Sequence, residues 1–347
     1  MKSLKKYTRK LLTKYQPHKK LSSLVFSPIE SLKDSFATYH LRPRRAATIG
    51  THADALINEP KTAIVIQGGL AEQHDFTLES IRLYKEHFPN AILILSTWEG
   101  NNSGYIEKIK NEHIEIVESP KPNFSGISNV NLQIISSQRG LERAKALGAL
   151  YAVKTRTDQR MYSPLALEFL RNVLKAFPLI KTNSIQKERI VSISLDTFKY
   201  RLYGLSDMFV FGHIDDMLLY WTPKLDMRNS EDVDLDSSVK NFGISRVCEV
   251  YFATEFLKKV DHMPTMTLAD SWYAYANYFC VIDQASIDLY WPKYMPRIEH
   301  RYTFYDHTRN SQALTFAEWL NLYVGLNNKA MIPENALSKR FGETVHT

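Results

Sequence analysis

The segment Leu150-Tyr-Ala-Val-Lys-Thr-Arg-Thr-Asp-Gln-Arg160 carries the most information about the fold and the site of this chain. Its first four residues are apolar and compatible with a strand, and they follow a helical stretch that stops at Gly148. The segment therefore predicts a short buried strand that runs into a group of charges. Because alternate residues of an extended chain share one face, we expect the charged side chains to point the same way. These are Lys154, Arg156, Asp158 and Arg160.

Cations around one carboxylate, at the carboxyl end of a central strand, suit a phosphorylated ligand such as a pyrophosphate. The alternative is a salt-bridged strand end without a ligand, because surface ion pairs are common and contribute little. The charge pattern alone fits a ligand site and a salt-bridged strand end equally well. The neighbouring segments provide the evidence that distinguishes them.

The first half of the chain alternates apolar runs with amphipathic stretches. We expect strands over residues 63–67, 91–95 and 113–118, and helices over residues 77–88 and 129–147. This rhythm is typical of an α/β fold with a mainly parallel, Rossmann-like sheet that helices cover on both faces. The second half is mixed, with strands expected over 189–194 and 208–212, and helices over 215–221, 247–257 and 315–326.

Ligands of such sheets bind outside the carboxyl ends of the strands. Besides the charged segment, three polar stretches fall at that edge: Gln67-Gly68-Gly69, Thr97-Trp98-Glu99 and the loop around Asn129. The convergence of four polar segments on one edge favours a ligand site over an isolated salt bridge.

The charge of the chain is concentrated at its start. The formal net charge is +7, and residues 1–20 hold eight Lys and Arg and no acid, so the rest carries +7 less 8, or −1. A near-neutral body argues against a nucleic-acid partner. Within the basic arm, Leu4, Tyr7, Leu11 and Tyr15 form one helical stripe, which predicts an amphipathic helix on an anionic membrane surface; a solvated basic tail is the alternative.

No stretch approaches the roughly 20 apolar residues of a membrane span, and no apolar run follows the basic arm as in a secretory signal. We therefore expect a cytoplasmic protein whose basic arm contacts a membrane. The expected organisation is a basic helix (1–20), a connector (21–60), a first half that carries the ligand edge (61–165), a second half (166–330) and a tail (331–347).

Several common chemistries are disfavoured by missing motifs. The pair Gly68-Gly69 lacks the further glycines of a dinucleotide fingerprint, and neither a zinc-protease nor a nucleophile-elbow pattern is present. Cys248 and Cys280 have no zinc spacing and fit a reducing compartment.

The charged segment resembles the D-x-D motif of GT-A glycosyltransferases, with Arg156-Thr157-Asp158 in its place and Arg instead of the first Asp. A set of motifs is more specifically similar to the WavE-type lipopolysaccharide-synthesis family, over residues 61–162 and more weakly to 294. The motifs are Ile66-Gln-Gly-Gly69, Phe76-Thr-Leu-Glu-Ser-Ile81, Ile94-Leu-Ser-Thr-Trp-Glu99, Asn129-Val-Asn-Leu-Gln-Ile134 and Lys154-Thr-Arg-Thr-Asp-Gln-Arg160.

This resemblance implies a GT-A-like fold and a nucleotide-sugar donor. It implies that residues 61–165 form a nucleotide-sugar-binding half and residues 166–330 an acceptor-binding half, in a protein that is peripheral on the inner membrane. It implies that the donor is bordered by Gln67, Gly68, Gly69, Thr97 and Trp98 around base and ribose, with Asn129, Asn131, Gln133 and Arg139 along the same edge. Lys154, Arg156 and Arg160 would face the diphosphate, and Asp158 would hold the ribose or a divalent metal, Mn²⁺ or Mg²⁺. Because the first carboxylate is missing, metal dependence stays open, and Arg156 is the alternative source of positive charge.

An inverting transferase also needs a general base for the acceptor hydroxyl. Candidates are Glu249, Glu255 and Asp207, of which we favour Glu249 near the start of a predicted helix. An aromatic group offers faces for stacking on acceptor sugars, although core packing is the alternative; it consists of Trp272, Tyr273, Tyr275 and Tyr278.

The expected activity is that of a hexosyltransferase-type glycosyltransferase, which moves a sugar from a nucleotide-sugar to a lipid-linked, lipopolysaccharide or capsule glycan. Two alternatives stay open: a nucleotidyltransferase-like enzyme, and a non-catalytic polysaccharide-assembly protein with a degenerate nucleotide site. Donor, acceptor, linkage, stereochemical outcome and oligomeric state do not follow from the sequence.

Overall fold

The computed structural model describes residues 24–28, 30–32, 42–46, 61–101, 103–180, 185–228, 243–244, 247–292 and 313–327. The chain divides into two compact units, residues 1–43 and 44–347. In the first unit, residues 24–28 and 30–32 are helical. The basic arm expected over residues 1–20 and the tail expected over 331–347 lie outside the described residues.

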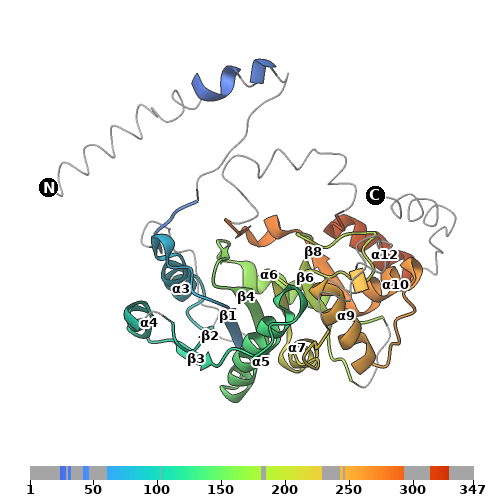
Figure 1. Cartoon of the computed structure of the whole chain (residues 1–347). Coiled ribbons are helices and arrows are strands. Elements are labelled where there is room, and N and C mark those ends of the chain that lie inside the picture. The colour runs from blue at the N-terminus through green and yellow to red at the C-terminus, as the bar shows by residue number, and fades with distance from the viewer. Residues whose placement is uncertain are drawn as a thin grey trace. The chain divides into compact units, whose positions relative to one another are not determined.

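The second unit is built on a seven-stranded sheet with strand order β3-β2-β1-β4-β7-β6-β8 (Figure 1). Strands β1 to β4 are mutually parallel, β7 is antiparallel to its neighbours β4 and β6, and β6 is parallel to β8. The strands are β1 (Thr62–Gln67), β2 (Ile92–Trp98), β3 (Glu115–Ser119), β4 (Tyr151–Arg156), β6 (Ile190–Ile193), β7 (Val210–His213) and β8 (Phe279–Ile282). A separate antiparallel pair joins β5 (Arg160–Met161) to β9 (Leu289–Tyr290).

The predicted α/β fold with a mainly parallel sheet and a mixed second half is confirmed. All six residues of β1 are buried, because helices cover both faces of the sheet and a central strand meets no solvent. The helices are α3 (Phe76–His87), α4 (Ser103–Lys110), α5 (Val130–Ala146), α6 (Ala166–Ala176), α7 (Ile214–Trp221), α9 (Cys248–Lys259), α10 (Leu268–Tyr278) and α12 (Phe316–Asn327). Short 3₁₀ turns occupy Gln73–Asp75, Ile127–Asn129 and Gln284–Ile287.

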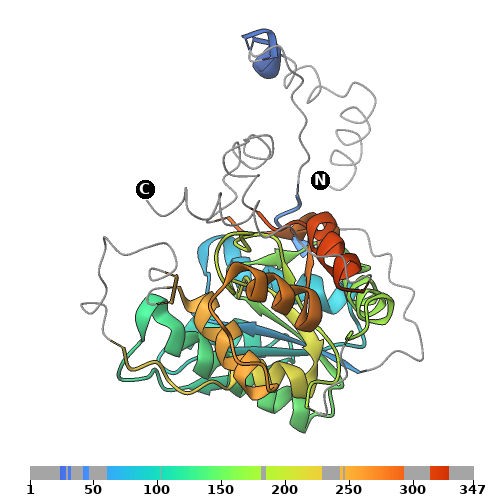
Figure 2. The same ribbon diagram turned by 90° about the vertical axis from the view of Figure 1, so that its right-hand side faces the viewer.

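Helix α5 packs closely on one face of the sheet. A Cβ atom added to Gly140 would lie 2.3 Å from a methyl group of Val65 and 3.1 Å from the Cβ of Ser96, so a glycine is needed there. Helix α6 lies on the opposite face. There the guanidinium of Arg171 donates to the hydroxyl of Thr62, which shares this face of β1 with Ile64. Two views at right angles show helices on both sides of the sheet (Figures 1 and 2).

The aromatic stretch 268–282, for which we expected no particular element, divides into helix α10 and strand β8, which extends the sheet beyond β6. The structure differs from the expected elements at the charged segment. The charged segment is not one continuous strand, because β4 ends at Arg156 and a turn leads to the separate strand β5. Among the described residues, none of the helices combines the length and apolar character that crossing a bilayer requires.

Candidate functional site

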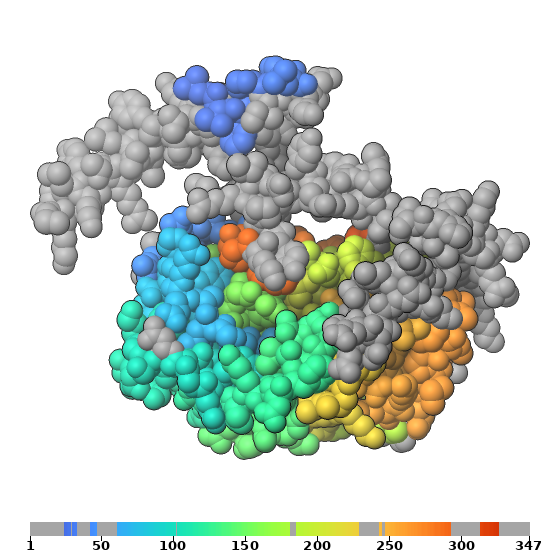
Figure 3. Space-filling model, in the orientation of Figure 1, coloured from blue at the N-terminus to red at the C-terminus, as the bar shows by residue number. Residues whose placement is uncertain are grey.

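The carboxyl ends of β1 and β4 meet at one edge of the sheet, where Gln67 pairs in register with Arg156. Because β7 is antiparallel to β4, with Val210 opposite Lys154, the residues just before β7 lie at the same edge. In the space-filling view, the green surface of the β4 region lies between the cyan first half and the yellow and orange second half (Figure 3). The site is therefore assembled from both halves of the chain.

The glycine pair after β1 is fixed to the turn after β4. The amide of Thr157 donates to the carbonyl of Gln67 (3.1 Å), and its hydroxyl donates to the carbonyl of Gly69. The φ angle of Gly68 is +117°, a conformation that side chains with a Cβ rarely adopt. The predicted glycine turn thus exists, and its role is to hold the ends of β1 and β4 together.

Arg156 and Asp158 form an ion pair at this edge. The Nε and Nη2 atoms of Arg156 lie 2.9 and 3.2 Å from the two carboxylate oxygens of Asp158, and the guanidinium stacks 5.0 Å from the ring of Trp291. Burial alone would raise the pKa of Asp158, but hydrogen bonds and charge from Arg156 lower it below its usual range. Both side chains are about a third exposed or less, so the pair is ionised and accessible.

Lys154 lies one layer deeper and is completely buried. Its ammonium donates to the carbonyl of Asp207 and to the Oε1 of Gln133 (3.3 Å), and it lies 4.2 Å from the ring centroid of Trp221. Burial lowers the pKa of Lys154 to about 8, so the side chain is still mainly charged at neutral pH. This ammonium experiences the charges of four neighbours, which are Asp207, Arg156, Cys248 and Asp158. The two carboxylates of the site, Asp207 and Asp158, therefore both lie near it.

Behind Lys154, Asp207 and the first residues of α9 form a coupled acidic group. The thiol of Cys248 donates to carboxylate oxygens of Asp207 (3.4 Å) and Glu249 (3.2 Å), and Gln133 also donates to Asp207. Burial and the charge of Asp207 raise the pKa of Glu249 to about 7. The same two causes raise the pKa of Cys248 well above its usual value. A pKa near neutrality suits a carboxylate that acts as a general base.

Two places offer ligands to a divalent metal. Asp158 is a single carboxylate whose two oxygens both accept from Arg156, so it fits a metal poorly. Ligand atoms of Asp207, Cys248 and Glu249 all lie within 4.8 Å of one another. A cysteine binds metals as a thiolate, so a metal there would require Cys248 to lose its proton. The raised pKa of Cys248 opposes that loss.

Arg160 does not lie with the other predicted cations. Its guanidinium donates to Ser80 (2.9 Å) and to the carbonyls of Phe76 (2.9 Å) and Arg44 (3.1 Å), and it is buried against α3. The prediction that four charges share one face is therefore wrong for Arg160. The physical reason is the turn over Thr157 to Gln159, which ends the alternation of an extended strand.

The other predicted donor-binding residues divide into two groups. Gln67 accepts from Ser136, Thr97 donates to the carbonyl of Gly68, and both are buried beside the turn, as is Trp98. Asn129 is exposed at the start of α5. Two residues have partners elsewhere: Asn131 binds the backbone of Asp226 in both directions, and the exposed Arg139 pairs with Glu142.

The acceptor-side predictions divide in the same way. Glu255 pairs with Lys258 on α9, whereas Asp207 and Glu249 meet beside Lys154. Of the four aromatic residues, Tyr275 is fully buried and donates to the carbonyl of Arg201, and Trp272 donates to that of Lys199. These rings hold the loop between β6 and β7 in place.

Sequence reasoning gave a candidate role to Asp207 at the end of that loop, but none to residues 194–206. Its side chains Asp196 and Arg201 act electrostatically on each other, and Arg201 also acts on Glu249. The aromatic and basic run Phe198 to Tyr203 was the available signal, but only the strand order shows that it lies at the carboxyl edge.

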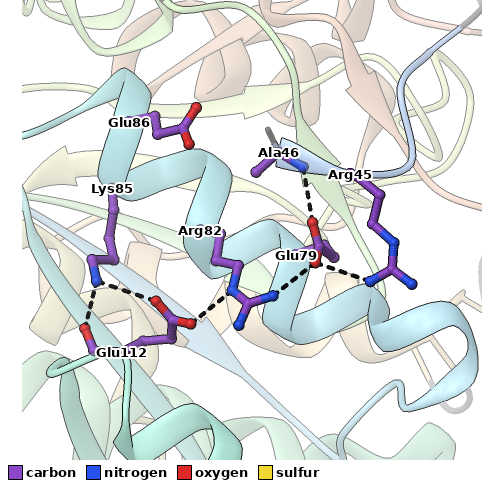
Figure 4. A pocket seen from close by; sticks show the side chains of 7 residues that line it. All are labelled: Arg45, Ala46, Glu79, Arg82, Lys85, Glu86 and Glu112. Carbon is purple, nitrogen blue, oxygen red and sulfur yellow. Dashed lines mark hydrogen bonds and ion pairs between the residues drawn. The ribbon is translucent and has the colours of Figure 1, made fainter. Parts of the chain in front are cut away.

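A hollow of about 490 Å³ lies on α3 and is lined by Arg45, Ala46, Glu79, Arg82, Lys85, Glu86 and Glu112 (Figure 4). Burial alone would raise the pKa of Glu79, but hydrogen bonds from the Ala46 amide, Arg45 and Arg82 lower it. Glu112 likewise accepts from Arg82 (2.7 Å) and Lys85 (3.2 Å). Since these charges already satisfy one another, this hollow anchors residues 45–46 to α3.

Residues 62–341 match the family of WavE lipopolysaccharide synthesis, and the chain belongs to this family. The resemblance of the sequence motifs is thereby confirmed, and the match extends beyond the range that those motifs cover. No curated protein matches the chain.

Two solved structures are similar at low identity. A cytidylyltransferase from Leptospira borgpetersenii is 13% identical with a TM-score of 0.32, over 59% of this chain and 75% of that chain. Glucosyl-3-phosphoglycerate synthase from Mycobacterium tuberculosis, in complex with Mn²⁺, uridine diphosphate and phosphoglyceric acid, is 14% identical with a TM-score of 0.30. That alignment covers 52% of this chain and 63% of the synthase, less than two thirds of its length. Identities and scores this low do not transfer either activity to this chain.

Proposed function

We propose that the chain is a hexosyltransferase-type glycosyltransferase that moves a sugar from a nucleotide-sugar donor to a lipid-linked, lipopolysaccharide or capsule glycan. The observation that carries the proposal is the arrangement around the buried ammonium of Lys154: the accessible Arg156–Asp158 pair acts on it, and so does Asp207, whose charge also acts on the partly buried Glu249 with its pKa near 7. A glycosyl transfer needs these two elements, a base for the acceptor and a cation for the leaving diphosphate.

In the proposed reaction, Arg156 contacts the donor diphosphate and Asp158 accepts from the ribose while holding the guanidinium. Lys154 is buried, so it contributes charge to this position without touching the ligand. Glu249 removes the proton of the acceptor hydroxyl. The oxygen of that hydroxyl then forms a bond to the anomeric carbon, as the bond to the diphosphate breaks and the diphosphate leaves with its electron pair. The base step applies to an inverting reaction.

The donor base and ribose would border the turn after β1 and the end of β2, at Gln67, Gly68, Gly69, Thr97 and Trp98, with Asn129 and Gln133 along the rim. A nucleotidyltransferase usually has a basic side chain in the loop after the first strand. Gln67-Gly-Gly-Leu70 has none, so we favour sugar transfer. Both carboxylate oxygens of Asp158 accept from Arg156, so we assign the positive charge on the diphosphate to Arg156 and not to a Mn²⁺ or Mg²⁺ ion at Asp158.

Binding of nucleoside diphosphates, measured by isothermal titration calorimetry, tests the donor site. Arg156→Ala and Asp158→Ala should each weaken binding by about tenfold or more, since charge-assisted hydrogen bonds are lost. Lys110→Gln, a change at an exposed cation on α4, is the matched control and should bind as the wild type does. Unchanged affinity in both site variants would refute the assignment. Donor hydrolysis by the wild type, measured with and without chelator, separates an enzyme from a non-catalytic assembly protein.

For the basic arm, we propose a peripheral position on the cytoplasmic side of the inner membrane. The support is the sequence alone: eight cations and one apolar helical stripe within residues 1–20. Deletion of residues 1–20 should abolish binding to anionic liposomes in a sedimentation assay and leave the thermal unfolding transition unchanged. Binding that survives the deletion would disprove the proposed membrane contact.

A further inference from the structure

The loop between β6 and β7 lies at the ligand edge of the sheet. Strand β6 is antiparallel to β7, which is antiparallel to β4, so β6 and β4 run in the same direction and both end at this edge. The loop continues into Asp207, whose carbonyl accepts from Lys154. Residues 194–206 therefore border the proposed site on the side of Glu249.

The backbone of this loop is fixed at several points. The carbonyl of Lys199 accepts from Trp272 (2.7 Å), that of Arg201 accepts from Tyr275 (3.2 Å), and the amide of Tyr203 donates to Ser271 (2.9 Å). All three partners belong to α10, so one rigid helix sets the position of the loop. Rigid support of this kind is what a binding residue needs in order to present its side chain without a large entropic cost.

The side chain of Arg201 is held in the same way, except at its charged end. A Cβ added to Gly204 would lie 2.3 Å from the Cδ of Arg201 and 2.7 Å from its Cγ, so the aliphatic stem rests on the glycine. The guanidinium stacks 4.4 Å from the ring of Phe198. Within the described part of the chain, its N–H groups have no acceptor within hydrogen-bond distance and no ion-pair partner, although its charge acts on Asp196 and Glu249.

We propose that Arg201 binds an anionic group, phosphate or carboxylate, of the acceptor sugar. A planar guanidinium with unused donors recognises such groups by two parallel hydrogen bonds. Its charge acts on Glu249, and the base must reach the reacting hydroxyl, so the anion lies close to that hydroxyl. The proposal rests on the proposed function for the identity of the acceptor side, and it names the substrate class as acidic sugars.

Ligand-observed NMR on the full chain tests this, with glucose 6-phosphate, glucuronate and glucose as probes, each with and without a nucleoside diphosphate. Wild type should bind at least one acidic probe about tenfold more tightly than glucose, a difference typical of charge-assisted hydrogen bonds. The stronger acidic probe distinguishes phosphate from carboxylate. Arg201→Gln should lose the preference, and Gly204→Ala should weaken it by displacing the side chain while keeping the charge. Lys110→Gln should retain it.

Equal binding of acidic and neutral probes by the wild type, or a preference that survives in Arg201→Gln, would overturn the proposal. Weaker nucleoside diphosphate binding in Arg201→Gln would also overturn it, because the residue would then belong to the donor site. Failure of the proposed function gives a different result: the wild type binds no nucleoside diphosphate, whatever the probes do. Thermal unfolding of each variant shows whether it is folded.

Discussion

The ammonium of Lys154 lies 4.2 Å from the ring centroid of Trp221, in a position where no part of the lysine is exposed. A charge buried this deeply is costly, and the fall of its pKa to about 8 is one expression of that cost. Its partners are a backbone carbonyl, an amide and an aromatic face. We infer that the charge is retained for its effect on the neighbouring Arg156–Asp158 pair.

Replacement of Lys154 should therefore change the affinity for nucleoside diphosphates more than it changes the free energy of unfolding. Lys154→Met keeps the packing on Trp221 and removes the cost of the buried charge, but it leaves the carbonyl of Asp207 and the Oε1 of Gln133 without their donor. Because these two effects oppose each other, the free energy of unfolding at pH 7 should stay within about 2 kcal/mol of the wild-type value. Nucleoside diphosphate affinity should fall in the same variant. Urea denaturation and calorimetry measure the two quantities. A strongly destabilised Lys154→Met with unchanged affinity would show that the lysine is structural.

The pH dependence of that comparison has a definite sign. The folded pKa of Lys154 is about 8, below its ordinary value of 10.5, so the unfolded chain binds more protons between these values. Wild-type stability should accordingly rise relative to Lys154→Met between about pH 8 and pH 10.5. A stability difference between the two proteins that is constant over this window would contradict the buried position of the charge.

Glu249 should control a rising limb in the pH profile of sugar transfer. Its pKa is about 7 and the carboxylate is the basic form, so kcat/KM should rise through about pH 7. Asp207→Asn removes the neighbouring negative charge and should move the limb to lower pH. In Glu249→Gln, activity should fall by at least about a hundredfold and the limb should disappear. A limb retained in Glu249→Gln would assign it to another group.

Arg160 and Arg156 should have opposite phenotypes. Arg160→Gln removes hydrogen bonds to buried partners on α3, so the free energy of unfolding should fall by about 2 kcal/mol, with nucleoside diphosphate affinity nearly unchanged. Arg156→Gln should be nearly as stable as the wild type and should bind much more weakly. Denaturation and calorimetry on the two variants provide the test. Equal losses of nucleoside diphosphate affinity in both would contradict the prediction and show that Arg160 takes part in binding.

Gly140 and Gly69 give a matched pair for the packing of α5 on the sheet. A Cβ at Gly140 would meet Val65 at 2.3 Å, whereas a Cβ at Gly69 would have nothing within 4 Å. Gly140→Ala should lower the free energy of unfolding by roughly 1–3 kcal/mol, through overpacking. Gly69→Ala should change it by less than about 0.5 kcal/mol. Urea denaturation of both proteins checks the prediction, which a silent Gly140→Ala would contradict.

Local pattern was sufficient to predict the parallel part of the sheet. The apolar runs that form β1, β2 and β4 have no polar face, which is typical of strands buried on both sides, and their order along the chain places their polar ends at one edge. The position of Glu249 near the start of α9 also followed from the pattern of residues 247–257.

Contacts between distant residues account for what the sequence did not predict. The Asp226 backbone that binds Asn131 lies 95 residues away, and Ser80 and Phe76 lie 80 and 84 residues from Arg160. Contacts between residues this far apart in the sequence produce no periodic pattern of residue types from which they could be predicted. The site role of Arg201 was missed for the same reason, since it depends on the direction of β6 in the sheet.

The central claim is that the edge formed by Arg156 and Asp158 binds a nucleotide-sugar. A thermal-shift panel of UDP-, GDP-, CMP- and dTDP-sugars, with and without Mn²⁺, on wild type and Arg156→Ala tests it most directly. A ligand that binds the folded state raises the unfolding temperature, because it stabilises that state by a free energy that grows with the logarithm of its concentration over its Kd. We predict that one donor stabilises the wild type and leaves Arg156→Ala unchanged. Equal stabilisation of both proteins, or none by any donor, would contradict the claim.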